Sequence, residues 1–302
     1  MSFNNIIGNE KVKELLNKSI EQNNILHSYL FLGTEGIGKS LFAHEFAKMI
    51  LCNGDEKEKP CNKCKSCIEF ENGNNPDFMQ IENEETAIKI EQIRYMNKKI
   101  SEKPITSTRK VYIINNSDTM TKDAQNSLLK TLEEPPQYAT IILIASNENK
   151  LLNTIRSRAI KVNFEQISEQ EILKYIKQNI TEDINENMIS FCNGSLGKVL
   201  RIIEDKQSYL ELEDLINKIS TNDLVYILNN SEILYKSKEI INDLLDYINI
   251  LLLKTQKIEN INCIQYVENA KKRLTSNSNY DMTIDELLIK MWEEINEKYN
   301  RG

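Results

Sequence analysis

A glycine-rich segment near the N-terminus has the residue types and spacing of a phosphate-binding loop. The pattern GxxxxGK[ST] is matched at every fixed position by Gly33-Thr-Glu-Gly36-Ile-Gly38-Lys39-Ser40. Glycines allow the backbone N–H groups to face phosphate oxygens, and the N-terminus of a following helix adds partial positive charge. Lys39 is expected to reach the outer phosphates and Ser40 to bind Mg²⁺. The segment predicts an ATP/Mg²⁺ site; a loop that keeps this shape without binding nucleotide is the alternative.

The carboxylates that a phosphate-loop ATPase needs are missing from their usual place. Such enzymes carry acidic residues at the end of a second buried strand, where one binds magnesium and another orients the attacking water. The corresponding strand is predicted at Val111–Ile114, and Asn115 and Asn116 follow it. An amide cannot act as a base and is a poor magnesium ligand beside a carboxylate. Because Asp118 is expected to start the next helix instead of replacing them, we predict that turnover is lost even where binding persists.

Four of the six cysteines cluster in the segment 52–67. They are Cys52, Cys61, Cys64 and Cys67. Two successive CxxC steps offer four thiolates, which suit tetrahedral zinc, and a complete set of four protein ligands predicts a structural site. A redox pair or an iron–sulfur cluster fits less well, because the segment follows a helix and is expected to contain no helix N-terminus that lowers a thiol pKa. Cys192 and Cys263 are isolated and are expected to be ordinary buried thiols.

Short apolar runs alternate with helical patterns over the first 165 or so residues. The apolar runs, which predict buried strands, are Tyr29–Leu32, Phe78–Ile81, Val111–Ile114, Thr140–Ala145 and Ile160–Phe164. The helical patterns between them are Lys39–Leu51, Ile90–Ser101 and Lys122–Leu132. Continuous apolar runs are typical of strands that are covered on both faces. These elements predict an α/β domain with a largely parallel sheet flanked by helices.

Beyond residue 165 the strand patterns end and helices predominate. Capping boxes at Ser168–Glu171 and Thr283–Glu286 predict two helix starts, and the break Asn193–Gly197 separates two short helices. We therefore predict an α/β domain over 1–165 with a zinc module at about 52–67, a small helical domain over 166–207 and an all-helical domain over 208–302.

The overall composition limits the classes of function. The net charge of −7 argues against a protein that coats nucleic acid through a general positive field. The sequence contains no apolar run near the roughly 18 residues that a membrane-spanning helix needs. Residues 1–10 lack the basic and apolar regions of a signal peptide. We therefore expect a cytoplasmic protein with no membrane partner.

Several short stretches have patterns that are specific to one protein family. Besides the phosphate loop and the cysteine spacing, they are His27–Gly33, Asn75-Pro76-Asp77, Asn126–Pro136 and Thr154–Ala159. Together they resemble the AAA+ clamp-loader subunits of bacterial DNA polymerase III. Asn75 stands where that family has histidine, and Ala159 replaces the cysteine of a Ser-Arg-Cys motif. The resemblance covers about residues 3–205 and implies an AAA+ domain with an inserted zinc module, a helical lid and a helical collar that joins subunits.

The resemblance also implies a role within that family. Its motor subunits, gamma and tau, keep Asp-Glu after the second strand and a sensor arginine in a Gly-Ser-Leu-Arg context. This chain has Asn115-Asn116 and Gly194-Ser195-Leu196-Gly197 instead. Arg158 is kept, and in the family it reaches the ATP of a neighbouring subunit as an arginine finger, a role that suits an always-charged guanidinium. Arg156 is expected to form an ordinary surface contact, and the pattern as a whole resembles the non-hydrolysing delta-prime subunit.

The implied assembly is a hetero-oligomer with gamma/tau and delta subunits, which acts on the sliding clamp and primed DNA. Two alternatives remain. An active gamma/tau-like ATPase is supported by the unbroken phosphate loop and opposed by the two amides. A zinc-dependent nucleic-acid-binding module would use the cysteine segment, but its lysines are mixed with acidic residues and it lacks an aromatic stacking platform.

Overall fold

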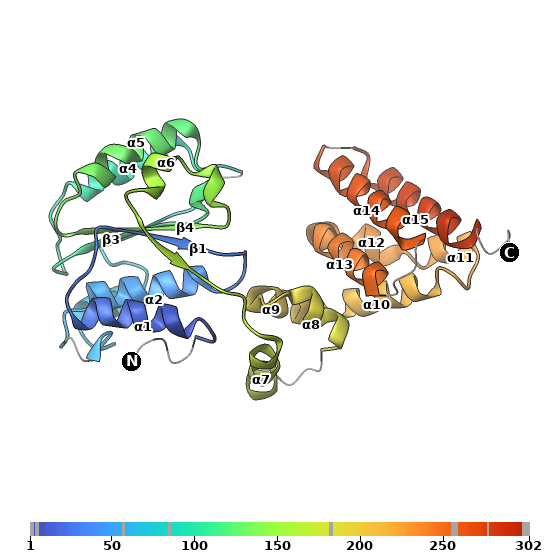
Figure 1. The fold of residues 1–302 in the computed structure, drawn as a ribbon, viewed down its shortest axis with the longest axis horizontal. Coiled ribbons are helices and arrows are strands. Elements are labelled where there is room, and N and C mark those ends of the chain that lie inside the picture. The colour runs from blue at the N-terminus through green and yellow to red at the C-terminus, as the bar shows by residue number, and fades with distance from the viewer. Residues whose placement is uncertain are drawn as a thin grey trace. The chain divides into compact units, whose positions relative to one another are not determined.

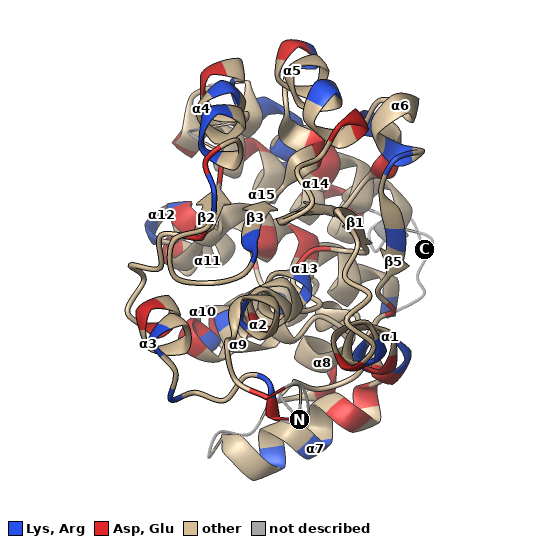
Figure 2. Ribbon diagram, turned by 90° about the vertical axis from the view of Figure 1, so that its left-hand side faces the viewer, with Lys and Arg blue, Asp and Glu red and all other residues tan. Residues whose placement is uncertain are grey.

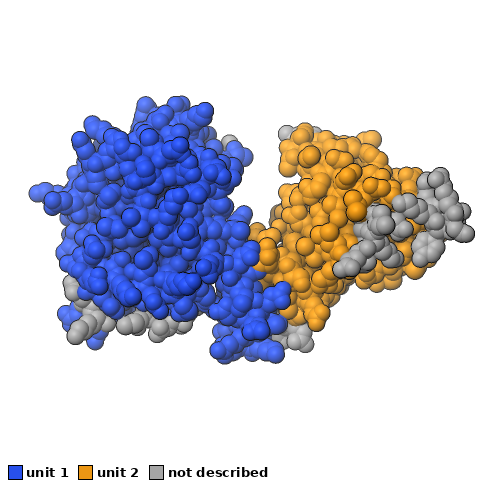
Figure 3. Space-filling model, viewed as in Figure 1, with its two compact units in different colours: residues 1–180, 194–197 blue, residues 181–193, 198–302 orange. Residues whose placement is uncertain are grey.

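The computed structural model describes residues 3, 6–55, 58–83, 86–180, 184–254, 259–276 and 278–297. The chain forms two compact units, which Figure 3 draws in different colours. The first unit comprises residues 1–180 and 194–197, and the second comprises residues 181–193 and 198–302. The three-domain division with breaks near 165 and 207 stays a prediction.

The first unit is built on a five-stranded parallel sheet with the order β2-β3-β4-β1-β5 (Figure 1). Its strands are β1 (Ser28–Leu32), β2 (Phe78–Ile81), β3 (Lys110–Ile114), β4 (Ala139–Ala145) and β5 (Ile160–Asn163). In the centre of the sheet, Leu30 is paired with Leu143 and Ile113 with Ile142. Each predicted run coincides with a strand to within one residue, which confirms the α/β prediction, but β5 is an edge strand in which only Val162 is buried.

Helices cover both faces of this sheet. The helices of the first unit are α1 (Glu10–Glu21), α2 (Lys39–Leu51), α3 (Lys65–Glu71), α4 (Ile90–Ile100), α5 (Lys122–Glu133), α6 (Asn153–Arg156) and α7 (Glu169–Asn179), with the 3₁₀ turns η3 (Ser117–Thr119) and η4 (Glu148–Lys150), and α7 lies away from the sheet (Figure 1). Figure 1 shows α1 and α2 on one face and α4, α5 and α6 on the other. Because side chains alternate along a strand, Tyr29 joins the core under α1 and α2 while Leu30 joins the core under α4 and α5.

The second unit contains helices in its described residues. They are α8 (Glu186–Cys192), α10 (Lys206–Lys218), α11 (Leu224–Asn229), α12 (Glu232–Lys236), α13 (Ile241–Lys254), α14 (Glu259–Thr275) and α15 (Tyr280–Glu297), with η5 (Lys238–Ile240) and most of α9 (Leu196–Glu204). Inside this unit the Glu213 carboxylate accepts hydrogen bonds from Asn185 Nδ2 at 2.8 Å and Asn187 Nδ2 at 2.9 Å, and from the Tyr247 hydroxyl. These bonds satisfy a partly buried carboxylate.

Charge is distributed without a single dominant sign. Figure 2 shows acidic and basic residues interspersed along the helices. Among the described residues, the helices are too short or too polar for any of them to cross a bilayer.

One of the two predicted capping boxes is confirmed and the other is wrong. Ser168 caps α7, and its side chain and that of Glu171 exchange hydrogen bonds with each other's backbone N–H. The last helix, however, begins at Tyr280 and not after Thr283. Asn279 caps it, because its Oδ1 accepts the N–H of Met282 at 3.0 Å. Asparagine is as good an N-cap as threonine, and the one further upstream is used here.

Candidate functional site

The phosphate loop joins the end of β1 to the N-terminus of α2. Gly38 caps α2 with a φ of 93°, in the left-handed region that favours glycine. A Cβ on Gly33 would lie 2.5 Å from Ile37 Cδ1 and 2.9 Å from the carbonyl oxygen of Phe164, so this position also requires glycine. The first turn of α2 leaves backbone N–H groups without helical partners, as an anion-binding loop needs.

Lys39 is the buried cation of this loop. Its side chain is turned into the loop, where Nζ donates to the carbonyl oxygens of Gly33 at 2.6 Å and Thr34 at 2.7 Å. Burial lowers the pKa of Lys39, while the negative charges of Asp118 and Glu35 oppose that shift. The ammonium group therefore lies beside the backbone that would surround a phosphate.

The two amides that follow β3 make backbone and surface contacts. The N–H of Asn115 donates to Ile81 at 2.9 Å and continues the pairing of β2 with β3. Asn116 is exposed, has a φ of 48°, and its Nδ2 contacts Asn83 Oδ1 at 3.4 Å. Asparagine tolerates this left-handed conformation better than most residues. The side chain of Asn116 is thus engaged with the loop after β2.

Asp118 is a carboxylate near the phosphate loop whose surroundings the sequence did not predict. It lies in the turn η3, ahead of α5, which starts after the cap Thr121. Asp118 Oδ2 accepts the N–H of Asn147, the second residue after β4, at 3.0 Å. Its charge also acts on Lys39. Asp118 therefore links the carboxyl ends of β3 and β4 beside the phosphate loop.

The four clustered cysteines are brought together as the spacing predicts. Their sulfur atoms all lie within 4.8 Å of one another, and tetrahedral Zn–S bonds of about 2.3 Å would place them roughly 3.8 Å apart. Cys52 Sγ accepts the N–H groups of Gly54 and Cys61, both at 3.3 Å. Burial raises the pKa of Cys52, and these two hydrogen bonds oppose that shift by favouring the thiolate. The donor set therefore fits zinc, which would be held by Cys52, Cys61, Cys64 and Cys67 and would link the ends of the segment 52–67.

A helix N-terminus lies inside this cluster, contrary to the prediction. Cys64 caps α3, and its Sγ accepts the N–H of Cys67 at 3.5 Å. Backbone N–H groups of Lys63 and Cys64 lower the pKa of Cys61 to about 6, whereas burial raises the pKa of Cys67. The segment folds back into a short helix because Cys64 can cap it, a possibility that the sequence interpretation left out. The case for zinc therefore rests on the sulfur geometry.

The cysteine segment is joined to the sheet through Asn75-Pro76-Asp77. Asn75 Nδ2 donates to the carbonyl oxygen of Ser66 at 3.0 Å. The Asp77 carboxylate is buried and accepts three backbone N–H groups of the segment 105–107 at 2.7 to 2.8 Å. A carboxylate with three such partners fixes a loop firmly. Asn75 serves here as a structural contact that joins Ser66 to the start of β2.

Arg158 follows α6 in the turn that leads to β5. Its backbone is fixed, because Ser28 Oγ donates to its carbonyl oxygen at 2.6 Å. Its side chain is 34% exposed, and its guanidinium forms an ion pair with Glu133 at 2.8 Å and donates to the carbonyl oxygen of Thr154 at 2.9 Å. Arg156, by contrast, contacts Asn153 and lies 3.8 Å from Glu148. The Arg158 side chain thus remains accessible above a fixed backbone.

These groups form separate sites in the first unit. Lys39 begins α2 and Leu51 ends it, directly before Cys52. A helix of 13 residues is about 20 Å long, so α2 separates the phosphate loop from the cysteine cluster. The contacts that the sequence did not reveal are those of Asp118 with Asn147 and of Arg158 with Glu133. Both depend on tertiary packing, and no local pattern signals them.

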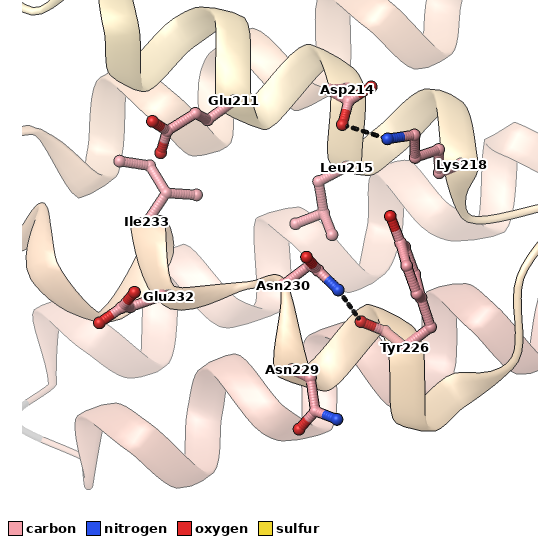
Figure 4. A pocket seen from close by; sticks show the side chains of 9 residues that line it. All are labelled: Glu211, Asp214, Leu215, Lys218, Tyr226, Asn229, Asn230, Glu232 and Ile233. Carbon is pink, nitrogen blue, oxygen red and sulfur yellow. Dashed lines mark hydrogen bonds and ion pairs between the residues drawn. The ribbon is translucent and has the colours of Figure 1, made fainter.

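A hollow in the second unit contains none of the predicted site residues. Its cavity of about 260 Å³ lies between α10, α11 and α12 (Figure 4). The lining residues are Glu211, Asp214, Leu215, Lys218, Tyr226, Asn229, Asn230, Glu232 and Ile233. Asp214 is paired with Lys218 at 2.7 Å, and Glu232 with Lys236 at 2.6 Å. Because these charges have partners within their own helices, the hollow adds no candidate site.

Comparison with known proteins relates the chain to replication subunits. Residues 8–168 match the family model described as DNA polymerase III, delta subunit. DNA polymerase III subunit gamma of Buchnera aphidicola is 33% identical over 210 residues, which cover 67% of this chain and 58% of that protein. Subunit delta' of Bacillus subtilis is 34% identical over 194 residues, which cover 64% of this chain and 58% of that protein. This chain therefore spans less than two thirds of either relative's length.

A solved structure gives the same fold. The DNA polymerase III gamma subunit-related protein of Thermotoga maritima aligns with a TM-score of 0.55 and 20% identity. The alignment covers 94% of this chain and 99% of that one.

Proposed function

We propose that this chain, which belongs to the family described as DNA polymerase III, delta subunit, is a delta-prime-like subunit of a clamp loader. In this role it helps to load the sliding clamp onto primed DNA. It does not hydrolyse ATP, and it donates Arg158 to the ATP site of a neighbouring subunit. The observation that carries the proposal is the combination of amides at Asn115 and Asn116 with an accessible Arg158 on a fixed backbone.

The amides support the absence of turnover. A metal-assisted phosphoryl transfer needs a carboxylate on magnesium and a group that orients the attacking water. Asn115 and Asn116 supply neither, and the side chain of Asn116 is engaged with Asn83. ATP with Mg²⁺, if bound, would be held by Gly33, Gly36, Gly38, Lys39 and Ser40. Its β- and γ-phosphates would accept hydrogen bonds from the loop N–H groups, and the nucleotide would serve as a structural ligand.

The surroundings of Arg158 support the finger role. Its ion pair with Glu133 is partly exposed, and such pairs contribute only about 0–1 kcal/mol. A phosphate on a neighbouring subunit could therefore replace Glu133 at small cost. The bond from Ser28 to the carbonyl oxygen of Arg158 would keep the backbone in place during that exchange. Arg156 is held by Asn153 and Glu148 and is assigned no such role.

The proposed partners are gamma/tau and delta subunits in a cytoplasmic hetero-oligomer. Within it, the C-terminal helices of the second unit would form the collar that joins subunits, residues 166–207 the lid, and the cysteine cluster a structural zinc module. ATP binding by the assembly would favour an open clamp, and hydrolysis on primed DNA would release it.

One observation favours a second function, that of a gamma/tau-like motor. Asp118 supplies a carboxylate beside the phosphate loop, and its charge acts on Lys39. If Asp118 replaced the missing magnesium ligand, the chain could hydrolyse ATP itself. Its bond to the N–H of Asn147 already uses one carboxylate oxygen, which supports a structural role instead.

The test is ATP turnover by an assembly of this chain with its gamma/tau-like motor and delta subunits. An arginine finger is worth about 10³-fold or more at the site it completes, so Arg158→Ala should reduce turnover to what the remaining sites support. Arg156→Ala is the matched control and should change turnover less than about twofold, since its contacts are with Asn153 and Glu148 of the same chain. Equal turnover in wild type and Arg158→Ala would contradict the finger role.

A further inference from the structure

The segment Gly194-Ser195-Leu196-Gly197 contacts the phosphate loop through its backbone. The N–H of Gly197 donates to the carbonyl oxygen of Gly36 at 2.9 Å. The segment is itself fixed, because the carbonyl oxygen of Gly194 accepts the N–H of Ile167 at 3.1 Å. Residues 194–197 and the phosphate loop both belong to the first unit. The segment 194–197 therefore stabilises the phosphate loop through a backbone hydrogen bond.

This contact is tight for any residue larger than glycine. A Cβ on Gly197 would lie 3.1 Å from Gly36 Cα and 3.2 Å from its carbonyl oxygen, closer than nine in ten real Cβ contacts, so Gly36 would have to move by a few tenths of an ångström. Gly197 lies in the first turn of α9, where its backbone conformation is open to any L-residue. Alanine would even favour the helix by about 1 kcal/mol. The close approach of Gly36 is thus the structural reason for glycine at this position.

The contact also orients a peptide group of the loop. In a planar trans peptide, the C=O and the N–H point in opposite directions. Holding the carbonyl of Gly36 toward Gly197 therefore directs the N–H of Ile37 away from it. On the other side, Lys39 Nζ binds the carbonyl oxygens of Gly33 and Thr34. The loop is held at two points, one by its own lysine and one by Gly197.

We propose that Gly197 is a positioning residue for nucleotide phosphates: its N–H and its lack of a Cβ hold the peptide of Gly36 and Ile37 in the binding conformation. This inference rests on the proposed function, because it takes the phosphate loop as a nucleotide site. Its ligand class is a nucleoside triphosphate with Mg²⁺. A loop that is ordered before binding loses less conformational entropy when phosphate arrives, so the contact raises affinity.

The test is a comparison of the full chain with Gly197→Ala and Gly73→Ala. Gly197→Ala keeps the N–H but pushes Gly36 away. Gly73→Ala is the control for a strained glycine substitution away from the loop, because its Cβ would meet nothing within 4 Å but its φ of 70° opposes alanine. Hydrogen exchange should be about fivefold faster at residues 36–38 in Gly197→Ala, with the exchange of α9 no faster. Mg·ATP affinity, measured by calorimetry, should fall about tenfold, and Gly73→Ala should leave both quantities unchanged.

A second variant adds loss of the hydrogen bond to the steric contact, so its difference from Gly197→Ala reports on the hydrogen bond. Gly197→Pro removes the donor, and the first turn of a helix tolerates proline. It should accelerate exchange at residues 36–38 at least as much as Gly197→Ala. Unchanged exchange in both variants would overturn the positioning role, as would faster exchange with unchanged ATP affinity. A wild-type chain that fails to bind Mg·ATP would instead contradict the nucleotide site itself, while exchange still reports on the contact.

Discussion

The phosphate loop and the Arg158 turn lie in the same unit but differ in what they can contribute to ATP chemistry. The loop has a buried lysine and the required glycines, yet amides follow β3 where an ATPase has carboxylates. The Arg158 turn offers a single accessible cation on a fixed backbone. Phosphate binding needs only the loop, whereas hydrolysis needs several groups together. On our proposal, this chain therefore keeps a phosphate loop that can bind nucleotide and an arginine that can reach a neighbour's ATP, and it contributes to hydrolysis only at that neighbour's site.

The first test of this comparison prevents zinc binding by the cysteine cluster and measures whether the phosphate loop or Arg158 is affected. Cys64→Ser should abolish zinc binding, from one ion per chain to none, because a structural site needs its complete set of four ligands. Zinc content measured by mass spectrometry checks this, with Cys192→Ser as the matched control that should keep its zinc. The ATP affinity of the chain and the ATP turnover of the assembly should both stay within about twofold of wild type, since α2 separates the cluster from the loop by about 20 Å. A full complement of zinc in Cys64→Ser would contradict the assignment.

A second test restores the carboxylates. In the double variant Asn115→Asp with Asn116→Glu, the affinity for Mg·ATP should rise about tenfold, because carboxylates are stronger magnesium ligands than amides. The increase should disappear when magnesium is chelated. Asn126→Asp, on the exposed face of α5, controls for added charge and should have no such effect. An affinity for ATP that is the same with and without magnesium would mean that residues 115 and 116 do not reach the magnesium ion.

The smallest expected effect concerns the resting partner of Arg158. Glu133→Gln removes the charge of an exposed ion pair that contributes about 0–1 kcal/mol, so turnover of the assembly should change by no more than about threefold. We expect an increase, because the guanidinium no longer exchanges one anion for another. Glu134→Gln is the neighbouring control. A loss as large as that of Arg158→Ala would mean that Glu133 is required to position the arginine.

Much of the fold could be predicted because its signals are local. Strands buried on both faces read as continuous apolar runs, and Val111–Ile114 lies within β3, which adds only Lys110. The phosphate loop and the cysteine spacing specify their own geometry through glycines and ligand positions. These features needed no knowledge of distant residues.

The remaining features depend on contacts between distant residues or on competing caps. The pairing of Arg158 with Glu133 follows from where α5 and α6 lie over the sheet. The contact of Gly197 with Gly36 likewise joins segments far apart in the chain. The prediction for Thr283 failed because Asn279 offered a cap one turn earlier. The helix at Cys64 was missed because cysteine is an unusual N-cap.

The measurement that tests the central claim most directly is binding and turnover of Mg·ATP by the purified chain alone. We predict saturable binding that Lys39→Ala abolishes, with turnover no higher than in a blank. Lys39→Ala also identifies any contaminating ATPase, because a contaminant is unaffected by that change. Turnover that Lys39→Ala removes would contradict the account, and it would assign the chain to the motor subunits with Asp118 as a catalytic carboxylate.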